Sequence, residues 1–176
     1  MGKWGSRFPG ISMRKIICCL LLLASWNAFA RGPDEGKPAP GLEGRYLSGT
    51  AFSLQDMRGK VVIVNFWAAW CPPCREEMPA LDGLYKLYHN QGLEIIGISI
   101  DGKADEPNVK AVAHSYSYPV ALLEAVKADE FGRIWRLPMT FIIDRHGIVR
   151  KSAWYCEPKN AASELEKIIV PLLKEE

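Results

Sequence analysis

Two cysteines separated by two residues are the side chains in this sequence best placed to do chemistry. Cys71 and Cys74 flank Pro72 and Pro73, and they directly follow a run of apolar residues. A cysteine thiolate is the nucleophile of thiol–disulfide exchange, and two cysteines at this spacing can close a disulfide between themselves. The pattern predicts a redox pair in which Cys71 attacks a substrate and Cys74 resolves the mixed disulfide.

A buried strand and the start of a helix are predicted on the two sides of this pair. Residues 61–66 form a continuous β-branched and apolar run, typical of a strand that is buried on both faces in a parallel or mixed sheet. Pro72 and Pro73 fit the first turn of a helix, where the missing N–H groups would have had no intrahelical partner. Cys71 is therefore expected at a helix N-terminus, where free N–H groups and the helix dipole lower the pKa of a thiol.

Zinc binding is the main alternative for this motif, because half of a four-ligand zinc site has the same cysteine spacing. A second pair of ligands is missing, since Cys156, His89, His114 and His146 do not stand at ligand spacing. We therefore expect no metal and no other cofactor, and we assign no chemistry to the histidines.

The composition is that of one globular domain. The chain has 176 residues, of which 48% are hydrophobic and 24% charged, enough to bury a core without structural disulfides. The first thirty residues hold four of the 22 Lys and Arg residues and none of the 20 Asp and Glu residues, leaving 18 basic against 20 acidic residues in the remainder. This near-neutral remainder argues against binding of nucleic acid.

The N-terminal segment is predicted to be a secretory signal. Arg14 and Lys15 precede an apolar stretch at 16–24, and Ala28-Phe29-Ala30 resembles a small-residue cleavage site. An uncleaved membrane anchor is the alternative, but the apolar stretch is shorter than the roughly 20 residues that span a bilayer. We expect a signal at 1–30, a single domain at 31–176 and a periplasmic location.

Residues 66–79 resemble the active-site stretch of the thioredoxin superfamily, specifically its TlpA/ResA-like extracytoplasmic branch. They read Phe-Trp-Ala-Ala-Trp-Cys-Pro-Pro-Cys-Arg-Glu-Glu-Met-Pro. The resemblance implies an α/β fold of the thioredoxin-like kind, a three-layer α/β/α sandwich with a mixed central sheet, an N-terminal extension and a central insert. It also implies a protein-disulfide oxidoreductase.

The resemblance further implies a direction and partners. TlpA/ResA-like proteins are mostly reductants that receive electrons from a membrane donor of the DsbD or CcdA type. Protein thiols and disulfides would be the substrates, with apocytochrome c in cytochrome c maturation or the cysteine pair of a copper site as typical targets. A thiol oxidant is the alternative, because direction depends on how strongly the reduced state is stabilised.

Substrate contacts are implied around the cysteine pair. Pro138 is similar to the superfamily's cis-proline, although its place before an apolar strand would also suit an ordinary strand-edge proline. The implied substrate-binding residues are Trp70, Pro72, Pro73, Leu137 and Pro138.

Glu77 matches a glutamate that tunes the cysteines in ResA-like proteins. We expect it to exchange a proton with Cys74; the alternative is a solvated helix glutamate, like its neighbour Glu76. Asn65 stands where thioredoxin has a buried aspartate used in proton transfer, and an amide cannot take a proton. The catalytic set expected from the sequence is therefore Cys71, Cys74 and Glu77.

Other functions on a similar fold fit the motif less well. A thiol peroxidase would have threonine and proline ahead of a single attacking cysteine, where this chain has Trp67 and Ala68. A copper-binding chaperone would use the two cysteines as soft ligands, but such proteins have three residues between them and a distant ligand histidine. Cys156 is expected to be a buried, inert thiol, and a third redox-active cysteine is the alternative.

Hydrophobic periodicity and turn residues predict the remaining elements. We expect a short strand or hairpin at 46–54, helices at 72–90, 107–113, 127–134 and 159–174, and strands at 93–100, 119–123, 137–144 and 148–152.

Overall fold

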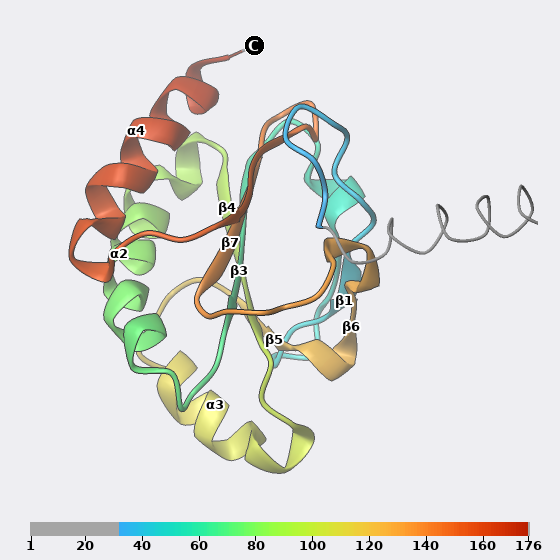
Figure 1. The fold of residues 1–176 in the computed structure, drawn as a ribbon, viewed down its shortest axis with the longest axis vertical. Helices are drawn as coiled ribbons and strands as arrows, with labels where there is room; N and C mark the ends of the chain where they lie inside the picture. Colours follow the sequence, from blue (N-terminus) through green and yellow to red (C-terminus); the bar gives the residue numbers. More distant parts are fainter. Residues whose placement is uncertain (1–31, 176) are drawn as a thin grey trace, which may run out of the picture.

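A five-stranded mixed sheet forms the centre of the molecule (Figure 1). The structure is a computed structural model that describes residues 32–175, so the predicted signal at 1–30 lies outside the described residues. The strand order is β5-β4-β3-β7-β8, with β3 at Val61–Trp67, β4 at Leu93–Ser99, β5 at Val120–Leu122, β7 at Met139–Ile143 and β8 at Val149–Trp154. In this order β3 runs parallel to β4 and antiparallel to β7. Every residue of β3 is buried, as its continuous apolar sequence predicted.

The α-helices cover one face of this sheet. They are α2 at Pro72–Tyr88, α3 at Glu106–Ala113 and α4 at Ala161–Lys174. Their buried side chains join Val61, Ile63 and Trp67 of β3 in one hydrophobic cluster, and Figure 1 shows α2 and α4 packed together on this side. Within the described part of the chain, no helix has the length and apolar content needed to cross a bilayer.

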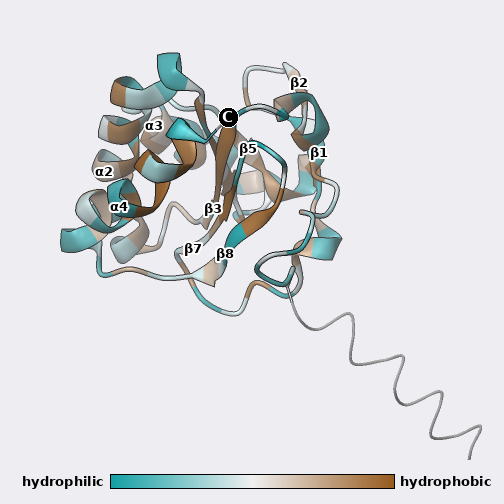
Figure 2. Ribbon diagram, turned by 90° about the horizontal axis from the view of Figure 1, so that it is seen from above, coloured by the Kyte–Doolittle hydropathy of each residue, from teal (hydrophilic) through white to brown (hydrophobic). Residues whose placement is uncertain are grey.

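A second, smaller sheet covers the opposite face. It has the order β2-β1-β6, with β1 at Glu43–Arg45, β2 at Ala51–Ser53 and β6 at Val126–Lys127. Beneath it lies a second hydrophobic cluster, to which β3 contributes Val62, Val64 and Phe66. Figure 2 shows hydrophobic residues along the central strands and hydrophilic residues on the outer turns of the helices. The alternation of β3 side chains therefore builds a core on each side of the sheet.

The predicted α/β fold with a mixed central sheet, an N-terminal extension and a central insert is confirmed. Of the three predicted α/β/α layers, the one opposite the α-helices is formed in the described residues by the small sheet β2-β1-β6. The helix expected at 127–134 is wrong: this segment holds the end of β6 and a single 3₁₀ turn at Asp129–Phe131. Phe131 turns inward and packs edge-on against Phe141, with ring centroids 5.0 Å apart, and Gly132 follows with a φ of 80°. Tertiary packing outweighs local helix propensity here.

Candidate active site

The end of β3 delivers the cysteine pair to the start of α2. Cys71 and Cys74 form a disulfide, and their Cα atoms are 5.3 Å apart. Cys71 is the N-cap of α2 and Pro72 its first residue, as predicted. The Cys74 backbone N–H donates to the Cys71 sulfur at 3.3 Å. An anion on this sulfur would therefore accept the Cys74 N–H at the positive end of the helix dipole, while Pro72 and Pro73 have no N–H to offer.

The surroundings of the pair range from open to deeply buried. Cys71 is 4% exposed and Cys74 1%, whereas Trp70 is 67% exposed. A hollow of about 380 Å³ adjoins the helix start, lined by Trp70, Pro72 and Tyr116 among others. Pro72 is exposed and Pro73 half-buried, so both prolines border the surface beside Cys71. A partner approaching from solvent meets the residues around Cys71 before it meets Cys74.

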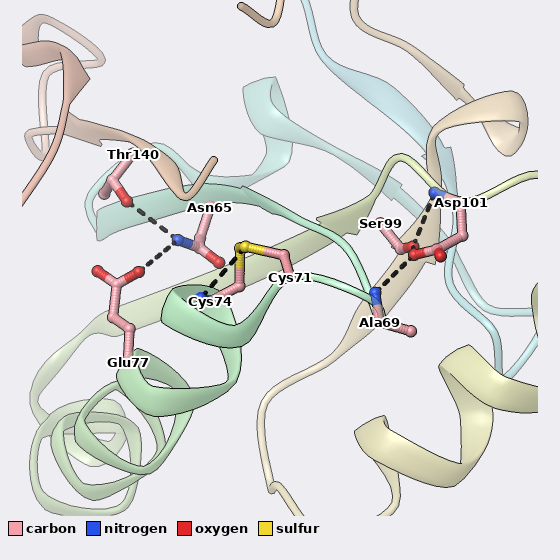
Figure 3. The surroundings of a disulfide bond; sticks show 8 residues. All are labelled: Asn65, Ala69, Cys71, Cys74, Glu77, Ser99, Asp101 and Thr140. Atoms are coloured by element: carbon pink, nitrogen blue, oxygen red, sulfur yellow. Dashed lines mark hydrogen bonds between the residues drawn. A yellow bond between two sulfur atoms is a disulfide. The ribbon is translucent and has the colours of Figure 1, made fainter. Parts of the chain in front are cut away.

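Glu77 lies in the interior, one turn beyond Cys74. It is 1% exposed, which rules out the solvated alternative. Asn65 on β3 donates through Nδ2 to Glu77 Oε2 at 3.3 Å and to Thr140 Oγ1 on β7 at 3.0 Å (Figure 3). Burial raises the pKa of Glu77 to about 7, against the weaker opposite effect of the hydrogen bond from Asn65. Glu77 can therefore give up or accept a proton near neutral pH.

A cis peptide bond joins Leu137 to Pro138, which confirms the cis-proline implied by the resemblance. Pro138 is buried and Leu137 half-buried. Met139, the next residue, pairs with Phe66 in the register of β7 against β3. Because Phe66 lies near the end of β3 from which the chain continues to Cys71, the proline turn lies at the same end of the sheet as the cysteine pair.

Several polar and aromatic residues of this region were not singled out from the sequence. Thr140 and Asp101 hydrogen-bond to groups on β3 and in the loop after it. Trp135, just before the cis-proline turn, is 64% exposed, and the guanidinium of Arg136 lies over its ring at 4.7 Å from the centroid. One signal was available: Asp101 follows β4, and parallel neighbours such as β3 and β4 bring their carboxyl ends to one edge of the sheet.

Cys156 is a buried free thiol, as expected. Burial raises its pKa, and the negative charges of nearby carboxylates add to this effect. Both effects disfavour the reactive thiolate. Between Gly32 and Glu175, no three His, Cys, Asp or Glu side chains gather closely enough to hold a metal ion.

Comparison with known proteins gives consistent similarities. A family model described as the AhpC/TSA family matches residues 36–152. The thioredoxin-like protein YneN of Bacillus subtilis (strain 168) is 33% identical over 145 residues, covering 77% of this chain and 84% of the relative. A thiol-disulfide oxidoreductase ResA of Bacillus cereus is 38% identical over 139 residues, covering 76% of this chain and 79% of the relative.

Solved structures with a similar fold include two oxidoreductases. A thiol:disulfide interchange protein of the thioredoxin family from Chlorobium tepidum TLS superposes with a TM-score of 0.65 at 29% identity, over 80% of this chain and 99% of that one. The thioredoxin domain of a thiol-disulfide oxidoreductase from Bacteroides vulgatus superposes with a TM-score of 0.64 at 28% identity, over 78% of this chain and 99% of that one.

Proposed function

Because the chain belongs to the AhpC/TSA family of thioredoxin-like proteins and is a thiol-disulfide oxidoreductase, we propose that it works as an exported reductase of protein disulfides. The position of the Cys71 sulfur supports the exchange chemistry of this proposal. It accepts the Cys74 N–H at the N-terminus of α2, and Cys74 is close enough to bond to it. A thiolate in this place is stabilised as a nucleophile while its resolving partner waits within reach.

In the proposed cycle the Cys71 thiolate attacks one sulfur of a substrate disulfide. A mixed disulfide forms, and one substrate sulfur leaves as a thiolate that takes up a proton. The Cys74 thiolate then attacks the Cys71 sulfur, which closes the Cys71–Cys74 disulfide and releases the second substrate sulfur. The cysteine pair thus gives two electrons to the substrate, whose two thiolates take up one proton released by Cys74 and one from solvent, and the disulfide of this structure corresponds to the oxidised end of the cycle.

Glu77 would take the proton that Cys74 must lose before it can attack. Its pKa of about 7 makes both its acid and its base forms available near neutral pH. Asn65 cannot accept a proton, but its amide donates a hydrogen bond that orients one carboxylate oxygen. Substrate contacts would come from Trp70, Pro72 and Pro73 around the attacking sulfur and from the turn Leu137–Pro138.

Direction and location follow from the resemblance to TlpA/ResA-like proteins. Residues 1–30 would direct export and be removed, leaving 31–176 as the domain that acts in the periplasm. A membrane donor of the DsbD or CcdA type would return the Cys71–Cys74 disulfide to the dithiol by supplying two electrons. Apocytochrome c or the cysteine pair of a copper site would be the substrate.

Replacing the resolving cysteine tests the cycle. Full-length protein carrying Cys74→Ser, produced in a bacterial host, should accumulate as a mixed disulfide between Cys71 and its partner that dithiothreitol releases. Mass spectrometry of the released partner identifies the substrate or the donor. The double variant Cys71→Ser, Cys74→Ser is the control, and equal capture by both variants would contradict the proposed attack by Cys71.

Direction and export need their own measurements. A reductase should be recovered mostly as the dithiol when cells are quenched in acid and alkylated, and mostly as the disulfide when the membrane donor is deleted. An oxidant would remain in the disulfide form in both strains. N-terminal sequencing of the periplasmic protein should begin at Arg31 if the signal is cleaved as proposed.

A further inference from the structure

A buried carboxylate links the end of β4 to the loop that carries the attacking cysteine. Asp101 is 5% exposed. Its Oδ2 accepts the backbone N–H of Ala69 at 2.8 Å and the hydroxyl of Ser99 at 2.6 Å, and its own N–H donates back to Ser99 Oγ at 3.1 Å. Figure 3 shows this group beside the disulfide, away from Glu77 and Asn65.

Sheet register places the carboxylate there. β3 and β4 are parallel, and Trp67 pairs with Ser99 at the carboxyl end of both strands. The Ile100 N–H donates to the Trp67 carbonyl at 2.9 Å, so the chain leaving β4 lies against the chain leaving β3. Asp101, two residues beyond Ser99, thereby reaches Ala69, two residues beyond Trp67.

Ala68 is fully buried in the hydrophobic cluster beneath the α-helices and anchors the first residue of the loop formed by residues 68–70, but few polar contacts hold the two residues after it. Trp70 is mostly exposed and contributes little packing. The loop's own turn is closed by the Cys71 N–H, which donates to the Ala68 carbonyl at 3.1 Å. Within residues 32–175, Asp101 provides the one side-chain hydrogen bond to the backbone of this loop. Without that acceptor the Ala69 N–H would lose its partner and the loop its connection to β4.

We propose that Asp101 is a positioning residue for disulfide exchange, which holds residues 68–70 so that the Cys71 sulfur stays aligned with the Cys74 N–H. This inference rests on the proposed function, because it assigns Asp101 a role in the same reaction. The carboxylate acts through geometry and not through its charge, since a negative charge near Cys71 would oppose formation of the thiolate. Asp101 contributes a hydrogen-bond acceptor for the Ala69 N–H, and the Ser99 hydroxyl holds this acceptor in one orientation.

Two variants of Asp101 separate its role as a hydrogen-bond acceptor from its charge. Asp101→Asn keeps an oxygen that can accept from Ala69 and Ser99 but removes the charge, whereas Asp101→Ala removes the acceptor. Asp144→Ala is the matched control. Asp144 is also a buried carboxylate that accepts backbone N–H groups, here those of His146 and Ile148. It follows β7 at the Val62↔Ile143 end of the sheet, opposite to the cysteine pair.

The readout is the pH dependence of iodoacetamide alkylation of full-length reduced protein, followed at Cys71 by peptide mass spectrometry. In Asp101→Ala the Cys71 sulfur should lose its alignment with the N-terminus of α2. The midpoint of the pH profile of Cys71 alkylation should then rise by about 0.5–1 pH unit, which slows alkylation at neutral pH by about 3- to 10-fold. Asp101→Asn should keep the wild-type midpoint or lower it. Asp144→Ala should keep it even if the protein is less stable.

Three results would overturn the inference: an unchanged midpoint in Asp101→Ala, the same shift in Asp144→Ala, or an Asp101→Asn profile as impaired as that of Asp101→Ala. If Asp101→Ala does not fold, Ser99→Ala takes its place, since it removes only the hydroxyl that orients the carboxylate. It should show a smaller upward shift, and a wild-type profile would overturn the inference. Oxidation of the reduced wild type by a small disulfide, oxidised glutathione, is measured in parallel. Failure of Cys71 and Cys74 to close their disulfide in this reaction would refute the proposed function, whereas an active wild type with unshifted variants would refute only the role of Asp101.

Discussion

Replacing Glu77 with glutamine should change how the stability of this protein depends on pH. Burial raises the pKa of Glu77 from an ordinary value of 4.5 to about 7 in the folded protein. Between these two values the folded protein keeps a proton that the unfolded chain has released. The stabilisation from this proton is complete below the unfolded pKa and is lost as the pH rises through the folded pKa.

The magnitude follows from the difference between the two pKa values. A separation of about 2.5 units corresponds to about 3 kcal/mol of unfolding free energy over the whole titration. About 2–3 kcal/mol of this should be lost between roughly pH 5 and pH 8.5, because the unfolded chain is already mostly ionised at the lower pH. Glutamine at this position does not titrate, so Glu77→Gln should lack this part of the pH dependence.

Equilibrium unfolding in urea across this pH range is the measurement. The oxidised protein is used, because the Cys71–Cys74 disulfide keeps both thiols from titrating. Subtracting the wild-type from the variant free energy at each pH cancels the other titrating groups. Glu76→Gln is the matched control: Glu76 precedes Glu77 on the same helix but is exposed, so its replacement should leave the wild-type pH dependence intact.

A difference between variant and wild type that stays constant with pH would refute the raised pKa of Glu77. A separate kinetic measurement tests the catalytic role. If Glu77 takes the proton of Cys74, Glu77→Gln should slow resolution of the mixed disulfide by about 10²-fold near neutral pH. Unchanged thiol pKa values together with an unchanged exchange rate would contradict that role.

Two further variants test the substrate surface and the smaller sheet. Trp70→Ala should change the unfolding free energy by less than about 0.5 kcal/mol, because the ring is exposed. It should nevertheless slow exchange with a protein disulfide more than with a small disulfide, whereas Leu87→Ala, an exposed control near the far end of α2, should affect neither rate. Gly44→Ala should destabilise the protein by about 1–3 kcal/mol in urea unfolding, because its methyl group would lie 2.5 Å from the Ala125 carbonyl oxygen. Gly41→Ala, which adds a methyl group in open space, should stay within about 0.5 kcal/mol of the wild type, and equal effects of the two glycine variants would contradict the close approach of β1 to β6.

Most elements of the fold were predictable, because their signals are local. The apolar run of β3, the prolines at the start of α2 and the apolar periodicity of α4 each depend on residues within a few turns or strand positions. The helix predicted at 127–134 does not form, because local helix propensity and tertiary contacts favour different conformations in this segment. Phe131 gains more from packing against Phe141 on the far side of a turn than from continuing a helix.

The sequence by itself determined the chemistry of the cysteine pair. The strand, the prolines and the two-residue spacing lie within about twenty positions, and together they place Cys71 at the start of a helix with Cys74 one turn away. The tertiary structure alone decided the environment of that pair. Asn65 meets Glu77 across 12 positions and Thr140 across 75, while Asp101 meets Ala69 across 32. These contacts depend on the register of β3 against β4 and β7. The alternation of apolar and polar residues that fixes register in a half-buried strand is missing from β3, which is buried on both faces, so its register is decided by the packing of the whole sheet.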